Sequence, residues 1–212
     1  MAIVKCFMFN PFQENTYVVY DETNTCVIVD PGMYHQAEEE ALQDFISRKN
    51  LTPVLLLNTH CHIDHIFGNK FVKDTYNVPF YAHELDMDNL RSAPQHASMF
   101  GVSMGPSPEP DAFIEPGKDI TFGNTTLKVL FTPGHSTGSV SFYNAENNFV
   151  LAGDTLFMGS IGRTDLPGGN YETLIDSIKS QLLTLPNATI VYSGHGSETT
   201  IVREKNSNPF LV

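Results

Sequence analysis

The chain has 212 residues, of which 24 are acidic and 12 basic, giving a formal net charge of −12. This charge makes nucleic acid and anionic membranes poor partners, because both require a basic face. No stretch approaches 18 apolar residues, so no membrane span is predicted. The three cysteines have no disulfide-like spacing and no secretory signal is visible, so we expect a reducing, cytoplasmic setting.

The first 50 residues predict three short strands and a helix. The strands are expected at 3–9, 16–20 and 26–29, and an amphipathic helix at roughly 35–50. Asp30 follows the third strand in the turn Asp-Pro-Gly, which is ordinary turn chemistry. We interpret Asp30 as a support for the loop that carries the next motif, rather than as a metal ligand.

A cluster of metal-binding residue types follows the next predicted strand. Residues 54–57 form a continuous apolar run, typical of a strand buried on both faces, and the pattern past residue 65 favours a helix. Between them lie His60, His62, Asp64 and His65. The first two histidines are two apart in extended backbone and face one side, so Cys61 between them faces away. The other two ligands follow the turn, and the window therefore predicts two metal half-sites.

Residues 84–117 have no clear periodicity. Five prolines interrupt this stretch, which follows a short predicted strand at 78–82. Long irregular segments inside a compact domain are usually functional lids or disordered. We therefore expect a lid or insert here. His83 and His96 have no partner at ligand spacing, and we interpret both as surface or core histidines.

The second half repeats the arrangement of strands followed by a metal-type residue and then a helix. Strands are predicted at 120–122, 125–131, 139–143, 149–152 and 188–192, and a helix at 170–185. His135, Asp154 and His195 each follow one of these strands beside a glycine. We therefore predict a single α/β domain, 1–212, with halves of about 1–83 and 118–212. Two mixed sheets flanked by helices would form a four-layer αβ/βα sandwich with the site at one shared edge.

Four segments in this order resemble the metallo-β-lactamase superfamily, and within it the glyoxalase II-like hydrolases: THCHIDH, PGHS, AGD and SGHG. The resemblance covers essentially the whole chain. It implies one metal ion bound by His60, His62 and His135, a second bound by Asp64, His65 and His195, and Asp154 bridging both. Zinc is the expected metal, and iron or manganese also suits a set of nitrogen and oxygen ligands.

Departures from other branches are informative. The best-known zinc β-lactamases carry Cys where this chain has Asp154 and lack a histidine after the motif aspartate, and flavodiiron proteins carry Glu at the position of His62. Neither resemblance fits this chain. Only 17 residues follow His195 (212 − 195), so we expect the chain to lack the helical C-terminal domain of classical glyoxalase II. The chain resembles the short, single-domain bacterial type.

The resemblance implies hydrolysis of a small-molecule thioester such as S-D-lactoylglutathione by a hydroxide bridging two metal ions, with Asp64 and Asp154 as catalytic carboxylates. Arg163 is a candidate for binding a substrate carboxylate, and the alternative is an ion pair with Asp165. A second hypothesis is a mono-iron persulfide dioxygenase, which shares the GRTD segment at 162–165 and would use His60, His135 and Asp154. The third is a non-catalytic metal-binding module. The oligomeric state is not predicted.

Overall fold

The computed structural model describes all 212 residues, which cluster into two compact units. The first unit comprises Met1–Ile114 and Thr121–Thr125, and the second comprises Glu115–Ile120 and Thr126–Val212. The structure contains two large mixed sheets, each of six strands, and one small sheet of two strands. No helix has both the length and the apolar composition needed to cross a bilayer.

The sheet of the first unit has the order β1-β2-β3-β4-β5-β6. Its strands are β1 (Ile3–Phe9), β2 (Glu14–Tyr20), β3 (Thr25–Val29), β4 (Thr52–Leu57), β5 (Phe80–Ala82) and β6 (Ala112–Phe113). The first three strands are antiparallel, and the strands from β3 to β6 are parallel. All five predicted strands of this half are therefore confirmed, and the loop after the parallel strand β4 carries the metal motif.

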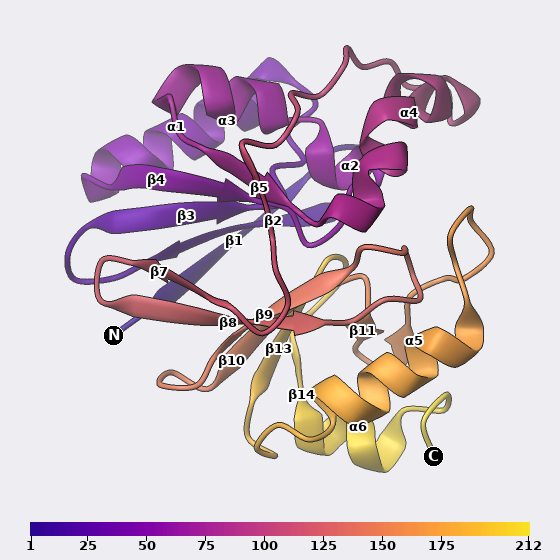
Figure 1. Ribbon diagram of the computed structural model, residues 1–212. Helices are drawn as coiled ribbons and strands as arrows, with labels where there is room; N and C mark the ends of the chain where they lie inside the picture. Colours follow the sequence, from indigo (N-terminus) through magenta and orange to yellow (C-terminus); the bar gives the residue numbers. More distant parts are fainter. The chain divides into compact units, whose positions relative to one another are not determined.

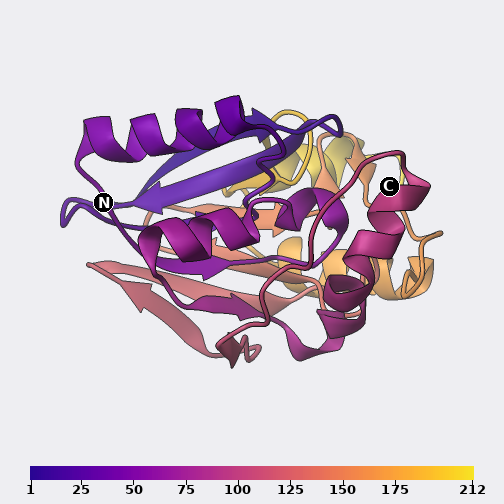
Figure 2. The ribbon, with the colours of Figure 1, turned by 90° about the horizontal axis from the view of Figure 1, so that it is seen from above.

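Helices cover one face of this sheet. They are α1 (Gln36–Lys49), α2 (Ile63–Ile66), α3 (Asn69–Tyr76) and α4 (Met87–Met99), with a 3₁₀-helix η1 (Glu84–Asp86) before the last. Figures 1 and 2 show α1 and α3 lying side by side on the sheet. The helix α1 buries Leu42 and Ile46, and it ends where Asn50 takes a left-handed conformation, which asparagine tolerates better than most residues. The helix predicted at 35–50 is confirmed.

The helix α4 differs from the sequence prediction, which found no element between residues 84 and 117. Pro94 lies inside it and has no N–H to donate, a feature that normally breaks a helix. Buried Leu90, Ala93 and Ala97 lie three and four residues apart, so tertiary packing of this face outweighs the local cost of the proline. His83 caps η1, because its Nδ1 accepts a hydrogen bond from Leu85 N at 3.3 Å.

The second large sheet has the order β14-β13-β10-β9-β8-β7. Its strands are β7 (Asp119–Phe122), β8 (Thr125–Phe131), β9 (Val140–Asn144), β10 (Phe149–Gly153), β13 (Ile190–Ser193) and β14 (Thr199–Thr200), and the small sheet pairs β11 (Leu156–Phe157) with β12 (Ser160–Ile161). The helix α5 (Tyr171–Ser177) continues as a π-helix, η2 (Ile178–Leu182), and α6 (Ile201–Ser207) lies near the end of the chain. Figure 1 shows α5 and α6 next to this sheet.

The apolar stripe predicted at 170–185 packs against the second sheet. Leu174, Ile178 and Leu182 form one buried cluster with Val150 and Val191 of the central strands. The strands β11, β12 and β14, each of two residues, and the helix α6 were not predicted, because such short elements have no usable periodicity. Two large mixed sheets with flanking helices confirm the predicted α/β class.

Candidate metal centre

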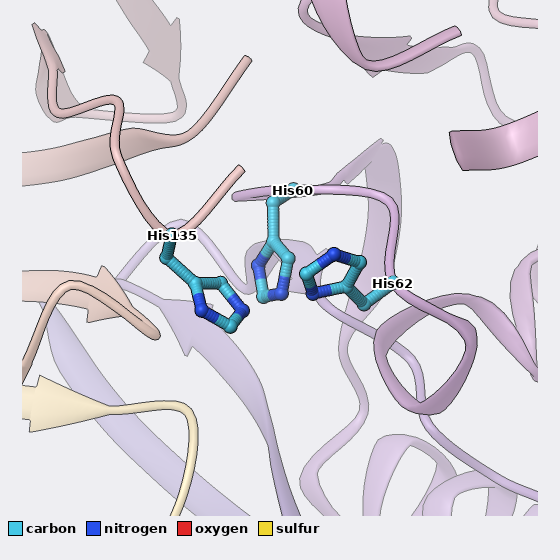
Figure 3. Close-up of side chains that lie close together, drawn as sticks. All are labelled: His60, His62 and His135. Carbon is cyan, nitrogen blue, oxygen red and sulfur yellow. The ribbon is translucent and has the colours of Figure 1, made fainter. Parts of the chain in front are cut away.

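The first cluster lies in the first unit, on the loop between β4 and α2. Figure 3 shows the imidazole rings of His60 and His62 projecting from this loop. The ring centroid of His60 lies 4.8 Å from that of His62 and 4.1 Å from that of His65. Asp64 Oδ2 lies 3.8 Å from His65 Nε2. The four metal-type residues of this window therefore form one cluster.

Asp30 supports this cluster from the end of β3. Its Oδ1 accepts a hydrogen bond from the backbone N–H of Thr59 at 2.7 Å, and its Oδ2 accepts one from the Thr59 hydroxyl at 2.6 Å. Asp30 Oδ2 also lies 3.1 Å from His65 Nδ1. Asp30, His60 and His65 are close enough to share an ion. Because both Asp30 oxygens already accept hydrogen bonds from this loop, we assign Asp30 the supporting role expected from the sequence.

The partners of the Nδ1 atoms indicate which histidine nitrogen is suited to a metal. The Thr59 hydroxyl donates its proton to Asp30, so it accepts from His60 Nδ1 at 3.1 Å. The Asp30 carboxylate likewise accepts from His65 Nδ1. Both rings then carry the proton on Nδ1 and the lone pair on Nε2. A histidine whose second nitrogen donates to an oxygen in this way is typical of metal sites.

Three residues that the sequence did not single out complete this support. Glu14 on β2 is fully buried, and burial raises the pKa of its carboxyl although His65 lowers it. A Cβ at Gly32 would lie 2.0 Å from Glu14 Oε2 and 2.6 Å from the Asp64 carbonyl oxygen, so a side chain has no room. Asn10 Nδ2 donates to the carbonyls of Gly32 at 2.9 Å and Asp64 at 3.0 Å. Glu14 and Asn10 belong to no motif, and Gly32 stood out in the sequence only as part of the Asp-Pro-Gly turn, so no pattern pointed to this support.

The second cluster lies in the second unit, where three segments far apart in the sequence each contribute one residue. His135 follows β8, Asp154 follows β10 and His195 follows β13. Asp154 Oδ2 lies 3.4 Å from His135 Nε2 and 3.5 Å from His195 Nε2. One carboxylate oxygen is therefore within reach of both imidazoles.

A backbone group orients His135, whose ring projects from the loop after β8 (Figure 3). Its Nδ1 donates to the carbonyl oxygen of Arg163 at 2.8 Å, which again leaves the lone pair on Nε2. The carbonyl can approach because residue 162 is glycine: a Cβ on Gly162 would lie 1.9 Å from the Asp154 carbonyl oxygen and 3.2 Å from His135 Cβ. This backbone role of Arg163 has no sequence signature.

The Arg163 side chain has a partner within its own loop. Its Nε and Nη2 donate to the two carboxylate oxygens of Asp165 at 2.7 and 2.8 Å. These hydrogen bonds lower the pKa of Asp165 to about 2. The geometry matches the ion-pair alternative considered above, and contact between Arg163 and a substrate stays a prediction.

Neither cluster is accompanied by a side-chain nucleophile. The Cys61 thiol is buried, burial raises its pKa, and its backbone N–H donates to Asp86 Oδ2 at 2.6 Å. A thiol in such surroundings is a poor nucleophile. Ser136 and Ser139 are buried with their hydroxyl oxygens 2.8 Å apart. The chemistry that this arrangement supports is therefore that of a bound metal.

The donors fit particular metals. Both clusters offer imidazole nitrogen and carboxylate oxygen and no sulfur, which suits zinc, iron and manganese. His60, His65 and His135 are held through Nδ1, and 2% or less of their surface is exposed, so they lose little entropy on binding an ion.

The first unit also contains a pocket of about 420 Å³ beside α2 and α3, lined by Phe67, Met104 and other residues.

Comparisons with known proteins agree with this chemistry. A family model described as "Metallo-beta-lactamase superfamily" matches residues 9–195. The "Probable metallo-hydrolase YqgX" of Bacillus subtilis is 42% identical over 203 residues, covering 95% of this chain and 93% of the relative. The "Hydroxyacylglutathione hydrolase GloC" of Haemophilus influenzae is 38% identical over 207 residues, covering 94% and 93%.

Solved structures show the same fold. The B3 metallo-beta-lactamase BLEG-1 superposes with a TM-score of 0.92 at 40% identity, covering 99% of this chain and 100% of the other. TTHA1623 in a di-iron-bound form gives a TM-score of 0.89 at 38% identity, covering 98% and 100%. ETHE1 from Myxococcus xanthus gives 0.80 at 27% identity, covering 98% and 83%.

Proposed function

Because this chain belongs to the metallo-beta-lactamase superfamily, we propose that it is a hydrolase with two metal ions that cleaves a thioester such as S-D-lactoylglutathione. Membership of the superfamily and the similarity to a metallo-hydrolase make a metal-dependent hydrolase the general class. The thioester is proposed from the relative described as a hydroxyacylglutathione hydrolase.

Two metal ions are assigned to ligands drawn from both clusters. The first ion would be held by His60, His62 and His135, the second by Asp64, His65 and His195, and Asp154 would be a ligand of both. One observation carries this assignment: Asp154 Oδ2 lies 3.4 Å from His135 and 3.5 Å from His195, the two histidines of its unit, which are assigned to different ions. A 38% identical protein has been solved in a di-iron-bound form. We propose zinc as the metal, with iron and manganese as alternatives.

The residues of the chain then have distinct tasks. When bound, two such ions would lower the pKa of water to near neutrality and polarise a carbonyl group. Asp154 would supply negative charge to both cations and so reduce their mutual repulsion. Asp64, whose side chain is 14% exposed, is the carboxylate that we assign to proton transfer. A thioester suits this set because its thiolate leaves without a general acid.

Metal analysis beside activity assays tests the proposal. Protein loaded with metal and passed over a desalting column should contain two ions per chain and should hydrolyse S-D-lactoylglutathione at neutral pH. One ion per chain under metal-replete conditions contradicts the dinuclear assignment. Two ions without thioester turnover contradict the substrate class and leave the metal assignment standing.

Two other activities have a specific observation in their favour. A mono-iron persulfide dioxygenase is suggested by the GRTD segment at 162–165, and it would consume oxygen with glutathione persulfide and hold one iron. Hydrolysis of a β-lactam is suggested by the 40% identity to BLEG-1. Assays with both substrates on the same preparation separate these activities from thioester hydrolysis.

The three cysteines are free thiols, which is compatible with the cytoplasmic setting that we propose.

A further inference from the structure

Two buried amides behind the first cluster take no part in the ligand set. Asn58 follows β4, Asn69 begins α3, and their side chains are 1% and 0% exposed. Asn69 Nδ2 donates to Asn58 Oδ1 at 2.8 Å. Asn58 Nδ2 in turn donates to the backbone carbonyl of His65 at 3.1 Å and lies 3.4 Å from Asp30 Oδ1. A chain of hydrogen bonds therefore connects α3 to the helix α2 that carries the second half-site.

The His65 carbonyl determines which group donates in each of these hydrogen bonds. The His65 carbonyl can only accept, so Asn58 must present its NH₂ group there and its amide oxygen toward Asn69. Asn69 must then present its own NH₂ group, and the second proton of that group goes to Ser107 Oγ at 3.1 Å. Asn69 is the single residue that donates both to Asn58 and to Ser107. Its oxygen, by contrast, is buried without a hydrogen-bond partner.

An unpaired buried oxygen destabilises a fold, and an apolar side chain of the same shape would avoid that cost. Asn69 therefore does something that an apolar residue could not. It donates two hydrogen bonds, one to Asn58, which supports α2, and one to Ser107 in a segment more than 30 residues further along the chain.

That segment, 102–109, has no helix or strand but is attached at three points. Tyr34 OH accepts from Ser103 N at 3.2 Å, Ser107 accepts from Asn69, and Glu109 forms a two-bond ion pair with Arg91 at 2.9 and 2.8 Å. Part of the segment lines the pocket beside α2 and α3. It is thus a tethered segment, and one of its tethers leads to α2.

The helix α2 needs such support because it has only four residues. A single turn has almost no stability of its own, since helix nucleation is unfavourable. Its carbonyls are held from two sides: Asn10 donates to that of Asp64 at 3.0 Å, and Asn58 donates to that of His65. The position of these two ligands follows from these contacts.

We propose that Asn69 is a positioning residue for the metal half-site formed by Asp64 and His65, acting through Asn58 and fixed in turn by Ser107. The proposal rests on the proposed function in that the ligands it positions are metal ligands. Segment 102–109 then contributes to this positioning. A substitution in it should alter the metal affinity of the site that contains Asp64 and His65, and not that of the site that contains His60 and His62.

The test compares Asn69→Leu with Asn144→Leu by zinc titration of the metal-free protein against a competing chelator. Asn144 is equally buried, donates to the Thr126 carbonyl at 2.9 Å and has no hydrogen bond to the ligand set. Asn69→Leu should lower the zinc affinity of the site that contains Asp64 and His65 by roughly 10–100-fold, the usual effect of losing an outer hydrogen-bond partner. The affinity of the site that contains His60 and His62 should stay close to wild type. Ser107→Ala should act in the same direction with a smaller effect, and Asn144→Leu should change neither constant.

Equal weakening of both ions, or the same change in Asn144→Leu at matched loss of unfolding free energy, would overturn the proposal. The proposed function fails separately, if wild-type protein binds fewer than two ions or does not cleave thioesters. In that case the ring-proton resonances of His65 in metal-free protein decide the positioning role. They should shift in Asn69→Leu and not in Asn144→Leu, and unchanged resonances in both variants would contradict it.

Discussion

The two units present metal-type residues in opposite ways. In the first, four of them occupy six consecutive positions, from His60 to His65, and side chains from other strands hold them in place. In the second, three residues arrive from the ends of three strands, and a backbone carbonyl holds His135. The first cluster is thus compact in sequence and supported by the side chain of Asp30, whereas the second is dispersed in sequence and has a backbone carbonyl behind His135.

This difference indicates where each cluster is vulnerable. Side-chain supports such as Asp30 can be removed by one substitution without moving the chain. The carbonyl of Arg163 remains whatever side chain residue 163 carries, so a substitution there leaves this support of His135 in place. Among the ligands of the second cluster, we expect Asp154 to be the most sensitive to substitution, because one of its oxygens lies near both histidines of the cluster.

The largest effect is expected from Asp154→Ala. If Asp154 reaches both ions, its loss removes the negative charge between two cations, and Asp64→Ala removes a ligand from only one. We expect Asp154→Ala to lower kcat/KM and metal content more than Asp64→Ala does, and by more than the roughly 10–100-fold that loss of an outer partner costs. Elemental analysis and thioesterase assays on both variants measure the difference. Retention of both metals and near-normal turnover in Asp154→Ala would show that it does not bridge.

Asp30→Asn sharpens the contrast between the two kinds of support. Asparagine keeps the size of the side chain and tolerates the left-handed backbone at this position, where φ is 50°. The change removes the charge that accepts from His65 Nδ1 and Thr59. We expect roughly 10–100-fold weaker metal binding at His65, measured by chelator competition. Arg163→Ala is the matched control, since the carbonyl behind His135 persists, and an equal loss in both variants would remove the distinction.

The same contrast explains what the sequence could predict. Four potential ligand residues within one short window indicate metal without any knowledge of the fold, and apolar runs located the strands around them. His135, Asp154 and His195 were found only because each follows a predicted strand, and their grouping required the resemblance to a family. Glu14, Asn58 and Asn69 were missed, because a single polar residue acquires its role from tertiary contacts. Likewise, Pro94 concealed α4, whose stability comes from the burial of one face.

Glu14 provides a comparison between the buried acids of the two units. Burial raises the folded-state pKa of Glu14 above the value of about 4.3 in an unfolded chain. Between these two values the native state keeps a proton that the unfolded state has lost, so stability falls as pH rises, by at most about 1.4 kcal/mol per pH unit. In metal-free protein, Glu14→Gln should therefore gain stability over wild type at pH 8 and not at pH 4, as measured by urea unfolding.

The matched substitution in the second unit should act in the other direction. Glu204 is also fully buried, but its carboxylate accepts hydrogen bonds from Thr199 Oγ1 at 2.6 Å, Gly159 N at 2.9 Å and Asn208 Nδ2 at 2.8 Å. A glutamine offers one acceptor oxygen to these three donors, so Glu204→Gln should lose roughly 1–3 kcal/mol. Loss of stability at pH 8 in both variants would show that Glu14 is ionised in the metal-free protein.

The smallest effect is expected at Arg163, where side chain and backbone have separate roles. The exposed guanidinium is bound by Asp165 through two hydrogen bonds, and since the pKa of Asp165 is about 2 the pair stays charged throughout any practical assay. Arg163→Ala should change KM for S-D-lactoylglutathione by less than about fivefold, the upper end of what an exposed ion pair contributes.

For the wild-type protein we also expect a high KM and only a small loss of activity on truncating the glutathione portion of the substrate, because binding energy far from the reacting carbonyl helps only when it orients that carbonyl. Steady-state kinetics on the intact and truncated thioesters measure both effects. A low KM that rises steeply in Arg163→Ala and on removal of the γ-glutamyl group would instead show that the side chain leaves Asp165 to bind substrate, making residue 163 a support for His135 and a specificity residue at once.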